Sequence, residues 1–257
     1  MIDIPLVAMF GAALTIGVRL TGLMLFAPFL GSIVIPARIK AVFVLALTVL
    51  LYPSLGHQTL PKSFAEWPML IFTEFAIGVG MGIATNLVFE AAQLAGSVLG
   101  IQMGYSLVNI LDPQSQIDTA VVAVFYQSIA MLLFLRMDVH YWLLRAVGNS
   151  FLYLPPGTAN VNSLFTLAVF KTVGSLFGLG IQIAAPVLAT TLAADVVLGL
   201  LGKASPQMPL MLLGPAVKSL LGLGILVATL KYWPDMFSRL FIDSMSKSEQ
   251  LLHLASG

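Results

Sequence analysis

One long apolar stretch decides the fold class of this chain. It runs from residue 67 to residue 111 and reads WPMLIFTEFAIGVGMGIATNLVFEAAQLAGSVLGIQMGYSLVNIL, with Glu74 and Glu90 as its only charges. A helix needs about 20 apolar residues to cross a bilayer core. The stretch is too long for a strand and lacks the alternation of a transmembrane β-barrel. The sequence therefore predicts an all-α fold built from apolar helices.

The rest of the chain has the same character. Further apolar stretches, each with at most one charge, cover residues 4–37, 41–61, 119–135, 146–170, 172–202 and 204–230. Counted in windows of spanning length, these stretches hold six or seven membrane spans if every window crosses. From Tyr232 onward the chain becomes amphipathic and polar. We expect this end to form a solvent-exposed helix that frays.

Composition restricts the class of protein. Hydrophobic residues make up 59% of the chain and charged residues 9%, and the mean hydropathy is +0.99. Ordinary globular domains contain about 45–50% apolar and about 25% charged residues. A soluble monomer of this composition would expose large apolar patches, so lipid, detergent or partner subunits must cover much of the surface.

Several functions are disfavoured by what the sequence contains. The net charge is only +1, without the clustered basic face that nucleic-acid binding needs. The chain has no cysteine and three scattered histidines, so no thiolate or histidine metal site is predicted. No nucleotide-binding, zinc-protease or hydrolase motif occurs. We therefore predict a protein that is not an enzyme, with no catalytic residues, cofactor or metal.

Several charges are embedded in the apolar stretches. Each costs about 2.5–3.5 kcal/mol at the centre of a helix in lipid. A proton- or ion-coupled transporter would use such carboxylates as relay sites, whereas a structural role would pair them between helices or subunits. No two carboxylates share one helix face within a turn, which favours ion pairs. These charges are Arg19, Glu74, Glu90, Lys171, Asp195 and Lys218.

Small residues recur along one face of the same long stretch. Gly96, Gly100 and Gly104 are spaced four residues apart and are preceded by Ala92. In apolar surroundings this spacing lets two helix backbones approach closely. The partner helix can belong to the same chain or to another subunit, and the sequence leaves both readings open.

A polar island at residues 105–119 follows this glycine face. The Asp112–Pro113 dipeptide disfavours helix before the proline, so a loop is expected there. The island also carries the apolar residues Leu107, Val108, Ile110 and Leu111. Non-helical backbone at membrane depth is tolerated only inside protein or along a cavity. The island is therefore either a surface turn or a plug.

Four passages, in order along the chain, together resemble the FliR family, the R-type subunit of the flagellar protein export gate. The injectisome homologues, the SctT family, share the late Pro-Gln feature, but the wording of residues 100–104 is more flagellar. The passages are RLTG at 19–22 with APFLG at 27–31 and IPAR at 35–38, GIQMGYS at 100–106, DPQS at 112–115, and ASPQMPL at 204–210 with LGPAVK at 213–218.

The resemblance implies a subunit of the flagellar type III export gate in the bacterial inner membrane, at the basal body. There it would join P-type and Q-type subunits, with the B-type subunit nearby, in a helical pore for unfolded flagellar proteins. It also implies a P-like part at residues 1–160, a Q-like hairpin at 161–235 and a polar tail at 236–257. The helices of such an assembly need not cross the bilayer as hydropathy suggests. The alternatives are an injectisome export gate, a small ion-coupled transporter and a scaffold without a gating role.

The resemblance further implies roles for named residues. Met103 is either a flexible seal of the pore or a core filler. The plug loop would comprise Met103, Tyr105, Ser106, Leu107, Val108, Asn109, Ile110, Leu111, Asp112, Pro113, Gln114 and Ser115. Buried or inter-subunit polar contacts would involve Arg19, Glu74, Glu90, Lys171, Asp195, Lys203, Gln207 and Lys218, and helix packing would involve Gly96, Gly100 and Gly104.

Overall fold

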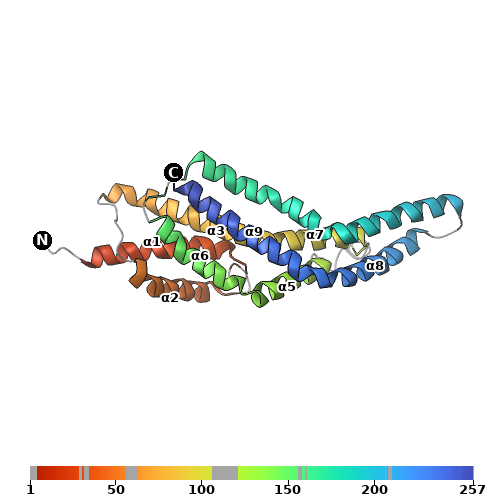
Figure 1. The fold of residues 1–257 in the computed structure, drawn as a ribbon, viewed down its shortest axis with the longest axis horizontal. Helices are drawn as coiled ribbons and strands as arrows, with labels where there is room; N and C mark the ends of the chain where they lie inside the picture. Colours follow the sequence, from red (N-terminus) through yellow and green to blue (C-terminus); the bar gives the residue numbers. More distant parts are fainter. Residues whose placement is uncertain are drawn as a thin grey trace. The chain divides into compact units, whose positions relative to one another are not determined.

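The computed structural model describes residues 5–28, 31, 35–55, 63–105, 121–155, 158–159, 161–205, 207 and 210–256. All regular structure within these ranges is helical, which confirms the all-α prediction (Figure 1). The α-helices are α1 (Pro5–Phe26), α2 (Ala37–Leu55), α3 (Trp67–Gln102), α5 (Val121–Arg136), α6 (Val139–Tyr153), α7 (Ser163–Ala204), α8 (Leu210–Thr229) and α9 (Trp233–Ala255). Two 3-10 turns, η1 (Phe64–Glu66) and η2 (Leu230–Tyr232), precede α3 and α9.

Two of the helices are longer than a bilayer core. With 36 and 42 residues, α3 and α7 are about 54 Å and about 63 Å long, against a core about 30 Å thick. Within the described ranges, four helical segments are long and apolar enough to cross a membrane, and α5 with α6 would make a fifth. The six or seven windows counted from the sequence exceed this number. One reason is that α7 runs through Lys171 without a break, so a charge that separates two apolar stretches lies inside one helix.

The chain forms two compact units. Unit 1 comprises Met1–Leu87, Asp138–Gly174 and Phe241–Gly257, and unit 2 comprises Val88–Met137 and Ser175–Leu240. Three of the boundaries fall inside α3, α7 and α9, and the fourth falls between α5 and α6. Each of α3, α7 and α9 therefore contributes one part of its length to each unit. The expected division into a P-like part at 1–160, a Q-like hairpin at 161–235 and a polar tail at 236–257 stays a prediction.

Unit 1 is built around α1, the first part of α3 and α6, with α2 beside α1 (Figure 1). Gly22 and Gly78 bring α1 and α3 into backbone contact, because a Cβ atom at either glycine would collide with the main chain of the other helix. The buried apolar core includes Ile16, Leu20, Ile77, Met81, Leu143, Val147, Phe151 and Leu251.

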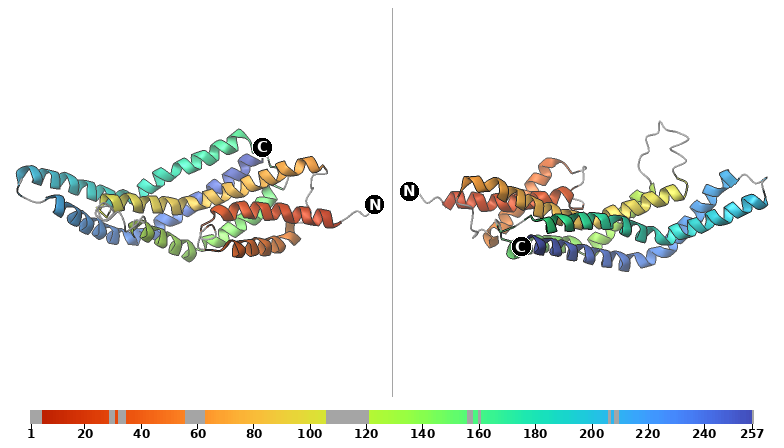
Figure 2. Two further views of the ribbon diagram at one scale, coloured as in Figure 1. Left: turned by 180° about the vertical axis from the view of Figure 1, so that it is seen from behind. Right: turned by 90° about the horizontal axis from the view of Figure 1, so that it is seen from above.

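Unit 2 contains the last part of α3, α5, the last part of α7 and α8. The α7 and α8 parts lie side by side as a hairpin (Figure 2). Gly96 of α3 packs directly on the backbone of α5 at Ala123. Phe89 and Phe134 meet edge to face at 5.3 Å between ring centroids, which adds a second contact between α3 and α5.

The C-terminal helix α9 packs along one face. Within unit 1, Phe241 and Leu251 are buried, and the Ser244 hydroxyl donates a hydrogen bond to the Ala84 carbonyl. Buried positions recur every three to four residues, which gives an amphipathic stripe with its polar face outward. The expectation of a solvent-exposed, fraying end is therefore wrong for residues 233–255. The segment is amphipathic in sequence, and its apolar residues lie on one helix face that is buried within the chain.

Candidate functional site

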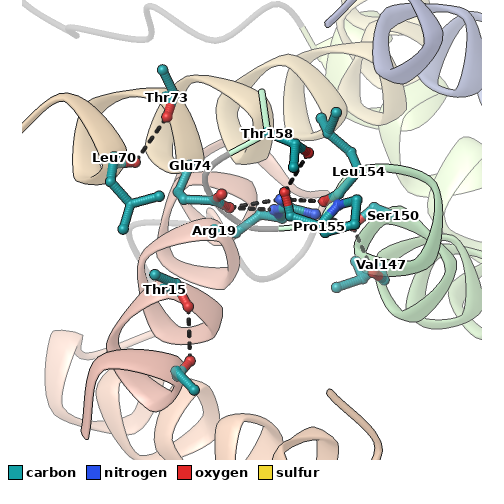
Figure 3. Close-up of polar contacts among 11 residues, drawn as sticks. Thr15, Arg19, Leu70, Thr73, Glu74, Val147, Ser150, Leu154, Pro155 and Thr158 are labelled. Carbon is teal, nitrogen blue, oxygen red and sulfur yellow. Dashed lines mark hydrogen bonds and ion pairs between the residues drawn. The ribbon is translucent and has the colours of Figure 1, made fainter. Parts of the chain in front are cut away.

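A sealed ion pair lies at the centre of unit 1. Arg19 of α1 and Glu74 of α3 are 1% and 0% exposed, and their side chains meet at 2.7 Å between Nη2 and Oε2. The Arg19 Nε also donates a hydrogen bond to Glu74 Oε2 at 2.7 Å. Figure 3 shows the two side chains pointing toward one another between their helices. A buried pair of this kind is stable only when its other polar atoms are also satisfied.

The other donors of Arg19 reach α6 and the residue after it. Arg19 Nη1 donates to Ser150 Oγ at 3.0 Å, and Nη2 donates to the Leu154 carbonyl at 3.0 Å (Figure 3). The guanidinium carbon lies 4.0 Å from the ring centroid of Phe151, a cation–π contact. Arg19 therefore ties three segments of unit 1 together. Its sealed, hydrogen-bonded environment suits a structural tie better than a relay that must exchange protons with water.

A second polar cluster lies in unit 2, around Asp195 of α7. Asp195 Oδ2 accepts a hydrogen bond from Gln102 Nε2 at 2.7 Å, and Oδ1 is 2.9 Å from Lys218 Nζ on α8. The Asp195 side chain is 41% exposed and that of Lys218 is 18% exposed. One carboxylate thus joins α3, α7 and α8, and unlike the Arg19 cluster it is open to its surroundings.

The end of α3 also contacts α8 directly. The Met103 carbonyl accepts a hydrogen bond from Ser219 Oγ at 2.8 Å, and the fully buried Met103 side chain packs on Gly222. Gly104 has a φ of +89°, a conformation that L side chains rarely adopt, and it faces Pro215. Two of the passages that resemble the FliR family, 100–106 and 213–218, thus meet in space.

The remaining predicted residues have different environments. Glu90, Lys171, Lys203 and Gln207 are exposed, Gly100 is buried, and Tyr105 is 36% exposed. Ser106, Leu107, Val108, Asn109, Ile110, Leu111, Asp112, Pro113, Gln114 and Ser115 lie outside the described residues. The packing of Gly96 on Ala123 supports the reading of close approach within one chain.

Sequence reasoning missed three residues that complete these clusters: Gln102, Ser150 and Ser219. Gln102 stands in the quoted passage 100–106 and is polar inside an apolar run, which is a signal that the sequence offered. Ser150 and Ser219 carry no such signal, because an isolated serine in an apolar helix is common and its partner lies far away in sequence.

An apolar hollow and the absence of a metal cluster complete the description. The hollow lies in unit 2 between α7 and α8 and measures about 530 Å³. Its lining includes Ala194, Val197, Leu201, Leu213, Val217 and Leu221. Within the part of the chain that the structure describes, no group of three or more His, Cys, Asp or Glu side chains is placed to hold a metal ion. The polar clusters around Arg19 and Asp195 hold helices against one another.

Long apolar helices tied by a few buried polar contacts define an all-helical protein of the membrane class. The sequence matches the family model described as bacterial export proteins, family 1, over residues 10–244. The chain therefore belongs to this family of bacterial export proteins, which confirms the resemblance to the FliR family.

Individual relatives agree with this assignment. The chain is similar to flagellar biosynthetic protein FliR of Escherichia coli strain K12, with 30% identity over 229 residues that cover 87% of each chain. It is 26% identical to FliR of Bacillus subtilis strain 168, over 83% of each chain. FliR of Aquifex aeolicus is 25% identical over 88% of this chain and 87% of its own length.

Proposed function

We propose that this chain is a subunit of the flagellar type III export gate, part of the channel that passes unfolded flagellar proteins across the bacterial inner membrane. The observation that carries the proposal is the family match over residues 10–244, together with relatives named flagellar biosynthetic proteins that match over 83% or 87% of each chain. A channel for diverse unfolded chains needs helices that pack and move, and it needs no reactive site.

Uneven burial of the apolar helices supports a role inside an assembly. In the most apolar window of the segment Phe64–Gln102, 61% is buried, but the figure is 28% in Ser163–Ala204 and 17% in Leu213–Ala255. Apolar surface of this extent marks contact with lipid or other subunits. We assign P-type and Q-type subunits, and the B-type export subunit, as the partners that share this surface with lipid.

The plug assignment belongs to the same proposal. It places Met103, Tyr105 and the residues up to Ser115 at the constriction of the pore. Met103 is buried against Gly222 within the chain, so in the single subunit it serves as a core side chain. Removal of residues 106–116 should raise ion leakage through the assembled complex in liposomes, because the seal would be lost. Unchanged leakage would remove the plug assignment.

Secretion tests the function itself. A strain that lacks this gene should stop secreting flagellar structural proteins, and the gene supplied on a plasmid should restore secretion. Loss of secreted virulence proteins instead would favour an injectisome gate. If the purified chain alone moved protons in liposomes and Glu90→Gln stopped that flux, the chain would be a transporter and the proposal would fail.

A further inference from the structure

We propose that Asp195 is a positioning residue that fastens the end of α3 to the α7–α8 hairpin, and that this fastening holds the export gate closed. The role in the gate rests on the proposed function, whereas the fastening is argued from contacts within unit 2 alone. Its elements are the Gln102–Asp195–Lys218 chain and the contacts of Met103 and Gly104 with α8. We call this set the α3 latch.

The geometry makes Asp195 the central member of the latch. Each of its carboxylate oxygens takes one partner, Gln102 on Oδ2 and Lys218 on Oδ1. Gln102 therefore reaches Lys218 only through Asp195. Removing the carboxylate breaks both links, whereas removing Lys218 or Gln102 breaks one. Asp195→Asn keeps an acceptor for Gln102 but loses the charge that attracts Lys218.

Exposure makes this latch able to separate. In the single chain Asp195 is 41% exposed and Lys218 18% exposed, so a group from outside the chain can reach each contact and replace it. Ion pairs that solvent reaches contribute little net stability. The Arg19–Glu74 pair, at 1% and 0% exposed, would leave two buried charges if it separated. Of these two ion pairs, the Asp195 pair is the one suited to a reversible step.

The latch lies at the C-terminal end of α3. Gln102 is the last residue of α3, and Met103 and Gly104 follow it directly. Ser219 binds the Met103 carbonyl, and Pro215 lies against Gly104. These contacts hold residues 103 and 104 against α8, so a shift of the α7–α8 hairpin would also move the end of α3.

A distance measurement on the full chain tests the fastening without relying on transport. The chain has no cysteine, so spin labels can be attached at Ile101→Cys and Leu220→Cys, which are 68% and 74% exposed on α3 and α8. The distribution of distances between the two spin labels should be narrow when the rest of the chain is wild type. It should be broader when Asp195→Ala or Asp195→Asn is added. The charge swap of Asp195→Lys with Lys218→Asp should narrow it again, because the amide of Gln102 can also accept a hydrogen bond. Lys231→Met is the matched control and should leave this distribution unchanged, because Lys231 is an exposed lysine in η2, outside the latch.

Leakage through the assembled gate tests the positioning role. Asp195→Ala should raise ion leakage up to about fivefold, which corresponds to about 1 kcal/mol, and the charge swap should restore the seal. An unchanged distance distribution in Asp195→Ala overturns the latch. A broader distribution with unchanged leakage overturns its role in the gate. If the wild-type chain fails to assemble with partner subunits, the proposed function fails, and the distance measurement still decides whether the latch exists.

Discussion

The two ion pairs of this molecule have the same chemistry and opposite surroundings. Arg19 and Glu74 in unit 1 are sealed, and the other donors of Arg19 reach Ser150 and Leu154. Asp195 and Lys218 in unit 2 are partly exposed. A sealed pair is expensive to break because each charge would stay buried without the opposite charge. An exposed pair can exchange partners, so we expect the ion pair to contribute more to the stability of unit 1 than to that of unit 2.

The largest effect should come from breaking the sealed pair on one side. Glu74→Ala should lower the free energy of unfolding by about 3–5 kcal/mol, because Arg19 would become an unpaired buried charge. Asp195→Ala should cost about 1 kcal/mol or less. Both can be measured as shifts in the unfolding midpoint of the purified chain in mixed detergents. Glu66→Ala, at an exposed position in η1, is the control. Equal losses for Glu74→Ala and Asp195→Ala would contradict the distinction between the two pairs.

The next effect concerns the close packing of α3 on α5 in unit 2. Gly96→Ala should cost about 1–3 kcal/mol through overpacking, because the added methyl group would meet the backbone of Ala123 and Val122. Gly174→Ala is the matched control, since a Cβ at Gly174 meets nothing within 4 Å. It should be neutral or slightly stabilising, because alanine favours helix. Similar losses for both glycines would show that close helix approach is not what stabilises unit 2.

An effect of similar size separates the two serines that complete the clusters. Ser150→Ala should cost about 1–3 kcal/mol, because Arg19 Nη1 would lose its buried acceptor. Ser219→Ala should cost less, since the Met103 carbonyl is only partly buried in its contact with Ser219. The same unfolding titration measures both variants. If Ser219→Ala lowered the free energy of unfolding more than Ser150→Ala does, the hydrogen bond at the end of α3 would be the more important of the two, and the ranking by burial would be wrong.

The smallest effect is expected when both members of the sealed pair are replaced together. The double variant Arg19→Met with Glu74→Leu should remain within about 1 kcal/mol of the wild type, because apolar side chains of similar volume remove the desolvation cost along with the attraction. A loss as large as that of Glu74→Ala alone would mean that the hydrogen bonds of Arg19 to α6, rather than charge pairing, hold unit 1 together.

The sequence predicted the elements of this fold better than their partners. Apolar length alone indicated an all-α membrane-class protein, and charges embedded in apolar runs indicated ion pairs. It could not show that Arg19 pairs with Glu74, 55 residues away, or that Ser150 is 131 residues away from the same side chain. Such contacts depend on which helices become neighbours, and one sequence contains no information on covariation.

The error at the C-terminal end has a different cause. The amphipathic, polar end from Tyr232 onward is predicted to be a solvent-exposed helix that frays, but Phe237, Phe241 and Leu251 form a buried stripe. Helical periodicity, rather than average polarity, is the property that predicts burial of such a segment. Gln102 is a similar case, because a polar residue inside an apolar helical run signals a polar contact. The plug residues from Ser106 to Ser115 lie outside the described part of the chain, so their role stays a prediction.

The most direct test of the proposed function is the size and content of the particle that contains this chain after mild extraction from native membranes. The chain alone has a mass of 27.4 kDa. We expect it to elute in a much larger complex that also contains P-type and Q-type export subunits, because the apolar windows of the segments Ser163–Ala204 and Leu213–Ala255 are only 28% and 17% buried within the chain. A folded, stable monomer in mild detergent, free of other export subunits, would contradict the account.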